Sequence, residues 1–218
     1  MLTTLSRKMI MGLTGLFLCF FLTIHLLGNL QLFLPAEEAR IQFNWYSHLL
    51  SGNALIKLVS YILYLSIIIH VVDSIIITSK NKKASTPYQY DKRKRASKWY
   101  SRNMGILGTI ILIFLVIHFK NFWYVYKFGE MPLDEQGQKD LYQIVVTTFQ
   151  EGWYVVIYVI AMIALCYHLL HGISSAFRSF GLYHPKYVRW VKYIGYAFSI
   201  IVCTGFALMP IYIFFTMK

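Results

Sequence analysis

The chain has 218 residues, of which 57% are hydrophobic and only 14% are charged, and its mean hydropathy is +0.53. A soluble domain would carry about 25% charged residues, so this composition excludes an ordinary soluble globular protein. The net charge of +12 would also suit a nucleic-acid-binding protein, but the distribution of the basic residues along the chain argues against that function.

The apolar residues fall into five segments, at residues 9–33, 54–78, 104–124, 153–177 and 191–215. Each segment meets the roughly 20 residues that are needed to cross about 30 Å of hydrocarbon in a helix. The first segment is too long, and too polar at His25 and Asn29, to be a cleaved signal peptide. We therefore predict an all-α membrane protein whose single domain, residues 1–218, is a bundle of five transmembrane helices.

The loops on the two sides of these helices differ in charge. Fifteen of the 21 lysines and arginines fall on the side of the N-terminus, and seven of the nine acidic residues fall on the other side. Because basic loops remain in the cytoplasm, we predict a cytoplasmic N-terminus and a C-terminus outside. The tryptophans lie near the ends of the segments, as in the aromatic belts of membrane proteins: Trp99 and Trp190 inside, and Trp45, Trp123 and Trp153 outside.

One histidine lies 14 to 16 residues into each of the first four segments. Because successive helices run in opposite directions, His25 and His118 should lie in the outer half of the membrane, and His70 and His168 in the inner half. Ionisable residues in hydrocarbon indicate a functional site, and imidazoles in facing pairs suit the two axial positions of a haem. Such ligation leaves the iron no open position and favours electron transfer. We predict an outer and an inner haem, with His171 as an alternative to His168.

Other interpretations of these histidines remain open. A single histidine in a membrane helix is more often a packing residue or a proton carrier, so a haem-free transporter with a histidine proton relay is the alternative of another class. The three cysteines, Cys19, Cys166 and Cys203, are isolated in apolar segments. Their spacing disfavours an iron–sulfur or zinc site in this chain.

At these residues the sequence resembles the di-haem cytochrome b membrane subunit of succinate dehydrogenases and fumarate reductases. The resemblance extends over almost the whole chain. It rests on Thr14-Gly15-Leu16 and Ile24-His25-Leu26 in the first segment, Ile69-His70 in the second, Gly108 to Ile117-His118 in the third, and Tyr167-His168-Leu169-Leu170-His171-Gly172 with Ser175, Ser179, Phe180 and Gly181 in the fourth.

The resemblance implies a membrane anchor and electron-transfer subunit with two b haems. It implies a flavoprotein and an iron–sulfur partner on the cytoplasmic face, a quinone substrate for which menaquinone is favoured over ubiquinone, and a place in the bacterial cytoplasmic (inner) membrane. There the complex would serve the respiratory chain and the tricarboxylic acid cycle, by succinate oxidation or fumarate reduction, while this chain alone would not act on succinate. The main alternative partner is a hydrogenase or a formate dehydrogenase.

In the family, the ligand of the fourth helix is followed by glycine four residues later, as in His168 and Gly172, although some members have histidine directly before glycine, as in His171-Gly172. Some fumarate reductases carry a proton-transferring glutamate two residues before this ligand, where this chain has Cys166. Asp73 is the remaining carboxylate within the segments, and we expect it to pair with the basic loop at 80–102.

Two further sets of residues are candidates for contacts with the haems and the quinone. Basic residues near the inner boundary could neutralise haem propionates: Arg7, Lys8, Arg102 and Arg178. A quinone needs an apolar slot with a few hydrogen-bonding groups. The candidates lie where the first helix ends and in the segment before the second, and they are Asn29, Gln31, Trp45 and His48. An ordinary interfacial loop explains the last set equally well, and a quinone site on the cytoplasmic side also stays open.

Overall fold

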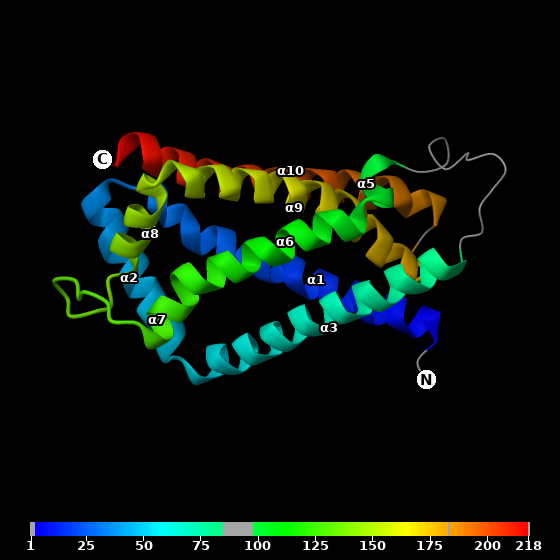
Figure 1. Cartoon of the computed structure of the whole chain (residues 1–218), viewed down its shortest axis with the longest axis horizontal. Coiled ribbons are helices and arrows are strands. Elements are labelled where there is room, and N and C mark those ends of the chain that lie inside the picture. The colour runs from blue at the N-terminus through cyan, green and yellow to red at the C-terminus, as the bar shows by residue number, and fades with distance from the viewer. Residues whose placement is uncertain (1–2, 85–97, 183, 218) are drawn as a thin grey trace.

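The computed structural model describes residues 3–84, 98–182 and 184–217. Five long helices run roughly along the longest axis of the molecule (Figure 1). They are α1 (Thr4–Asn29), α3 (Ala54–Ala84), α6 (Met104–His118), α9 (Gly152–Ser179) and α10 (Pro185–Thr216). All five, with the helical continuations of α1 and α6, are long and apolar enough to cross a membrane. The predicted set of five such helices is therefore confirmed.

Several helices extend beyond the apolar segments that predicted them. A 3-10 turn, η1 (Leu30–Phe33), continues α1, and a π-helix, η2 (Phe119–Tyr124), followed by α7 (Val125–Phe128), continues α6. The extensions of α3 and α10 run through polar residues, since a helix can continue into water once it has left the hydrocarbon. At the start of α10, Pro185 occupies the first turn and the His184 side chain accepts from the backbone N–H of Lys186.

The long helices pack with α9 at the centre, where it contacts α1, α6 and α10, while α3 lies against α1. Gly12 is one reason that α1 can approach α9 closely, because a Cβ at this position would lie 3.4 Å from the Cα of Ala176. After α9 the chain turns at Gly181, whose φ of 75° favours glycine. The turn closes with hydrogen bonds from Gly181 N to Arg178 O and from Leu182 N to Phe177 O.

Two shorter helices, α2 (Ala36–Gly52) and α8 (Leu141–Gln150), form a cap at the end of the bundle that also holds the C-terminus (Figure 1). Apolar side chains from the cap and the long helices form the main hydrophobic core there, including Leu32, Phe43, Val145, Phe149 and Ile213. The alternative that Trp45 and His48 lie in an ordinary interfacial loop was wrong, because both residues lie on α2. The four-residue helix α5 (Trp99–Arg102) lies at the opposite end, before α6.

The cap is held by a buried carboxylate, Asp140, at the start of α8. It accepts hydrogen bonds from Arg40 Nε at 2.8 Å, Asn44 Nδ2 at 2.9 Å and the backbone N–H of Gln143 at 3.1 Å. Burial raises the pKa of Asp140, but the hydrogen bonds from Asn44, Arg40 and Gln143 outweigh burial and lower the pKa below its usual value. Asn44 also accepts from the backbone N–H of Tyr142, so α2 and α8 are joined through groups that satisfy one another.

Candidate functional site

The structure brings the four histidines of the long helices together as two facing pairs. His25 of α1 and His118 of α6 have ring centroids 5.8 Å apart with planes at 87°. His70 of α3 and His168 of α9 have centroids 6.2 Å apart with planes at 62°. The partners in each pair are those expected from their depths in antiparallel helices.

These separations match the space that one metal ion needs between two imidazoles. A metal–imidazole bond is about 2 Å long, and the centroid of the ring lies about 1.1 Å beyond its nitrogen. Two imidazoles that bind one ion from opposite sides therefore have centroids about 6 Å apart, whatever the rotation of each ring about the common axis. Both pairs have ring centroids at about this separation.

The two pairs lie in different layers of the bundle. Gly15 of α1 packs against the inner pair, because a Cβ at this position would lie 3.2 Å from Cε1 of His70. His25 follows ten residues later on the same helix, which corresponds to a rise of about 15 Å. The layers are thus separated by about half the thickness of a hydrocarbon core.

Hydroxyl groups lie beside the Nδ1 atoms of one histidine in each layer. The Thr14 hydroxyl donates to the carbonyl of Ile10 at 2.9 Å, and its oxygen lies 3.1 Å from Nδ1 of His70. The Tyr158 hydroxyl lies 3.2 Å from Nδ1 of His118. When each Nδ1–H donates to the hydroxyl oxygen, the Nε2 lone pair is left free, which is the tautomer that binds a metal.

Two buried polar atoms near the inner layer have no partner among the described residues. They are His168 Nδ1 and Arg7 Nε, neither of which makes a hydrogen bond within that part of the chain. Such groups are costly in a membrane interior unless a ligand or water satisfies them. An anionic group near Arg7 would satisfy its Nε, as the carboxylate side chain of a haem could. His168 Nδ1 lies on the other side of the ring from the metal-binding Nε2, so it would still need a hydrogen-bond acceptor of its own.

The outer layer has an apolar, aromatic surround. Phe21 stacks on His25 with centroids 5.3 Å apart, and Phe206 lies 5.4 Å from the same ring. Phe114 and Phe122 contact His118 at 5.6 and 5.2 Å. At the inner layer the neighbouring positions include Gly15 and Gly108, where a side chain would approach the imidazoles. The outer pair is thus surrounded by aromatic rings, and the inner pair has glycines beside it.

Asp73 was expected to pair with the basic loop at 80–102, of which residues 85–97 lie outside the described residues; the structure pairs Asp73 with Arg7 of α1. Its carboxylate accepts from Arg7 Nη1 of α1 at 2.5 Å, and its side chain is only 7% exposed. The reason is the packing of α3 on α1, which brings Arg7 beside the last turns of α3. The positive charge of Arg7 and the negative charge of Asp73 thus neutralise each other between the inner layer and the end of the bundle.

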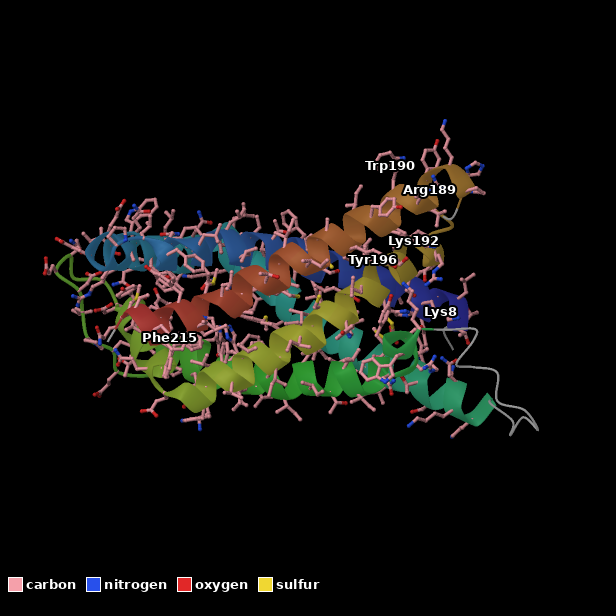
Figure 2. The ribbon with its side chains drawn as sticks, turned by 90° about the horizontal axis from the view of Figure 1, so that it is seen from above. Lys8, Arg189, Trp190, Lys192, Tyr196 and Phe215 are labelled. Atoms are coloured by element: carbon pink, nitrogen blue, oxygen red, sulfur yellow. The ribbon has the colours of Figure 1, made fainter. Side chains whose placement is uncertain are left out.

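The remaining sequence candidates for the inner layer lie at the same end of the molecule. His168, and not His171, makes the ring contact with His70, while His171 is half-buried one turn further along α9. Of the basic residues, Arg7 is half-buried, and Lys8, Arg102 and Arg178 are exposed. Lys8 lies on the first turns of α1 (Figure 2).

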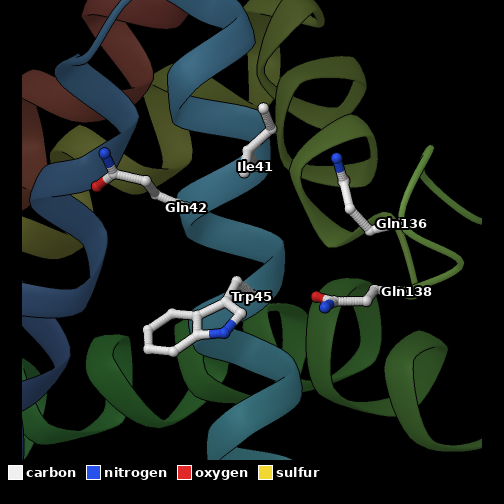
Figure 3. A pocket seen from close by; sticks show the side chains of 5 residues that line it. All are labelled: Ile41, Gln42, Trp45, Gln136 and Gln138. Atoms are coloured by element: carbon white, nitrogen blue, oxygen red, sulfur yellow. The ribbon is translucent and has the colours of Figure 1, made fainter.

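The four quinone candidates do not converge on one cavity. Asn29 is engaged with His25, since its Nδ2 donates to the His25 carbonyl at 2.7 Å and lies 3.3 Å from Nδ1. Gln31 donates to the Gly28 carbonyl. His48 is exposed on α2 rather than in a loop. Trp45 lines a shallow cavity of about 220 Å³ with Ile41, Gln42, Gln136 and Gln138 (Figure 3).

Sequence reasoning missed the residues that support the histidines. Thr14 lies in the Thr14-Gly15-Leu16 motif but was not assigned a role, and Tyr158 had no distinguishing signal. The π-helix after His118 also had none, although such irregular turns are frequent at functional sites. It carries Asn121, whose buried Nδ2 makes no hydrogen bond to any residue that the structure describes.

Comparison of this chain with protein-family models, with curated proteins and with solved structures finds no match. The interpretation of the site therefore rests on its residues and their geometry.

Proposed function

We propose that this chain is the di-haem cytochrome b subunit and membrane anchor of a succinate:quinone oxidoreductase, working as a succinate dehydrogenase or a quinol:fumarate reductase. The observation that carries the proposal is the presence of two facing histidine pairs, at two depths, on four of five membrane-type helices. A proton relay would need histidines within reach of one another along a path, whereas these are grouped two by two at a metal-binding separation.

In this proposal each pair of imidazoles binds one b haem, which supplies reversible one-electron chemistry when bound. His25 and His118 hold the outer group, and His70 and His168 the inner one. Thr14 and Tyr158 fix the tautomer and orientation of His70 and His118. Arg7 Nε has no hydrogen-bond partner within residues 3–84, 98–182 and 184–217, so it offers a donor to a propionate, while Asp73 holds the Arg7 side chain in place.

The proposed orientation has the N-terminus in the cytoplasm and the C-terminus outside, in a bacterial cytoplasmic membrane. It is supported by the excess of basic residues on the side of the N-terminus. A flavoprotein and an iron–sulfur protein would dock on the cytoplasmic face, next to the inner pair, and quinone chemistry would take place near the outer pair. Electrons would then pass between the partner and the quinone across the bundle.

A reduced-minus-oxidised optical spectrum of the purified chain tests the haem part of the proposal. We expect a b-type signal and two haems per chain. A chain that folds and is purified from haem-sufficient cells without any b-type signal would refute this part and favour a transporter.

The identity of the partner needs a separate experiment. We expect a complex purified through a tag on this chain to show reduction of its b haems on addition of succinate, and no reduction with formate or hydrogen. The opposite donor specificity would assign the chain to a formate dehydrogenase or hydrogenase and leave the haem assignment intact.

A further inference from the structure

The first turns of α10, residues 185–196, diverge from the rest of the bundle. Figure 2 shows this segment extending away from the other long helices, with Arg189 and Trp190 near its tip and Lys192 and Tyr196 closer to the bundle. Val188 and Val191 are half-buried and Gly195 is buried on the side that faces α9. The remaining sides of the segment are exposed.

The exposed sides carry two kinds of residue. Aromatic and aliphatic side chains that are 57–67% exposed include Tyr187, Trp190, Tyr193 and Ile194. Basic side chains on the same turns are exposed too: Lys186, Arg189 and Lys192. No acidic residue occurs between positions 184 and 196. Such a combination suits the boundary between hydrocarbon and headgroups, where aromatic rings and positive charges are both stabilised.

A further basic residue from another part of the chain joins this segment. Lys98, just before α5, donates from Nζ to the Tyr196 hydroxyl at 2.9 Å. Its ammonium also lies 5.2 Å from the centre of the Tyr196 ring and 5.5 Å from that of Tyr100. These contacts raise the pKa of Lys98, through the hydrogen bonds to Tyr196 and Tyr100, so it stays protonated. Lys192 precedes Tyr196 by one helical turn, on the same side of α10.

The depth of this cluster follows from the length of α10. Tyr196 is 20 residues from Thr216 at the other end of the helix, which corresponds to about 30 Å, the thickness of a hydrocarbon core. Lys98 and Tyr196 therefore lie at the membrane boundary, and residues 185–195 lie beyond it. The segment is directed away from the ends of the other long helices (Figure 2), so we infer that it lies above the lipid that surrounds the bundle.

We propose that Lys98, Lys192 and Tyr196 bind the headgroup phosphate of an anionic phospholipid, with Arg189 and Trp190 completing the surface above the leaflet. Two ammonium groups provide charge complementarity, and the tyrosine hydroxyl can donate a hydrogen bond to phosphate oxygen. The exposed aromatic side chains lie at the level of the headgroups and the glycerol. This surface is independent of the histidine pairs.

Trp190 provides a reporter for the test. The full chain is placed in bilayer nanodiscs that contain a small, equal fraction of either brominated phosphatidylglycerol or brominated phosphatidylcholine, both of which quench a nearby indole. The emission of Trp190 is obtained as the difference from a Trp190→Phe chain. We expect stronger quenching by the anionic lipid, with a local enrichment of about fivefold for each lysine that contacts the headgroup, and a decrease of the preference at high salt.

Variants distinguish a specific headgroup site from a general attraction of anionic lipid to a basic protein. The Lys98→Gln/Lys192→Gln chain should quench nearly equally with both lipids, whereas Lys192→Arg should keep the preference. The matched control is Lys57→Gln/Lys120→Gln, which removes two exposed lysines from the other end of the bundle and should leave the preference unchanged. Three results would overturn the proposal. The unmodified chain could be quenched equally by both lipids, or the control could lose the preference for the anionic lipid as much as the Lys98→Gln/Lys192→Gln chain does. A bound protein partner in the assembled complex could also protect Trp190 from both lipids.

Discussion

Single residues act on this site mainly through the imidazole nitrogens. The Nε2 atoms are the proposed ligands, and the Nδ1 atoms are set by neighbours such as Thr14 and Tyr158. Substitutions of a ligand and of its neighbour should therefore give different results, loss of a haem in the first case and weaker retention of it in the second.

We expect replacement of a ligand to remove one haem only. His70→Ala or His168→Ala should lower the haem content from two to one per chain with loss of the inner haem, and His25→Ala or His118→Ala should remove the outer one, because each pair holds its own group. The measurement is haem content normalised to the amount of chain in the membrane, together with a redox titration.

His171→Ala and His184→Ala are the controls for this series, and both should keep two haems. Retention of both haems by His168→Ala, with loss of one in His171→Ala, would transfer the ligand role to His171.

Thr14→Val removes a hydroxyl from His70 while the shape of the side chain is kept. Loss of a hydrogen-bonding neighbour of a metal-bound histidine costs about 10- to 100-fold in metal affinity, so the inner haem should dissociate more readily and the outer haem should not. Haem transfer to an apo-acceptor protein measures this. Thr109→Val is the matched control, because among the described residues Thr109 donates to the Gly105 carbonyl of its own helix, α6. An equal effect in this control would show that the loss does not depend on the contact between Thr14 and His70.

At the scale of the elements, the junction between α2 and α8 depends on one buried carboxylate. Asp140 has a fully buried side chain, but Arg40 is 39% exposed, so loss of the carboxylate leaves a solvated arginine and costs mainly the hydrogen bonds to the carboxylate, about 1–3 kcal/mol. We expect Asp140→Asn to lower the free energy of opening of α2 and α8 by an amount in this range, measured by hydrogen exchange in detergent. Glu38→Gln, which removes an exposed contact with Gln42, should change it by less than about 0.5 kcal/mol.

The same carboxylate predicts a pH dependence. The pKa of Asp140 is lowered in the folded cap, whereas in an unfolded chain it would be about 3.9. Its contribution to stability is therefore complete above about pH 4 to 5 and is lost as the pH falls through the lower folded value. Hydrogen exchange of α8, corrected for intrinsic rates, should accelerate in acid in the unmodified chain. If Asp140→Asn showed the same acid dependence, another group would be responsible.

The cap also shows what a hydropathy pattern cannot predict. The five long helices were predictable because each must keep about 20 apolar residues together. α2 mixes apolar residues with Glu37, Glu38 and Arg40, because it packs one side on the bundle, so its sequence was interpreted as a loop. The histidine pairs followed from helix direction and rise alone. Thr14, Tyr158 and the Arg7–Asp73 pair depend on how neighbouring helices are rotated, which the pattern of one segment does not contain.

At the scale of the whole molecule, the proposed orientation predicts which ends can be reached from outside the cell. Gln136 and Lys186 are exposed at opposite ends of the bundle, so cysteines introduced there should react differently with a membrane-impermeant maleimide. In a chain whose Cys19, Cys166 and Cys203 are replaced by alanine, Gln136→Cys should be labelled in intact spheroplasts and Lys186→Cys only after lysis. Labelling in the reverse order would invert the orientation and move the partner to the other face.

The offset of about 15 Å between the histidine layers also has an electrical consequence. An electron that passes from one layer to the other crosses about half of the hydrocarbon, and a full crossing is worth about 2.3 kcal/mol for each 100 mV of membrane potential. Half of that changes an equilibrium about sevenfold. With the cell interior negative, transfer from the inner layer to the outer one is favoured and the return is opposed. The voltage of the membrane would thus bias the direction of electron flow through this chain without any change in its structure.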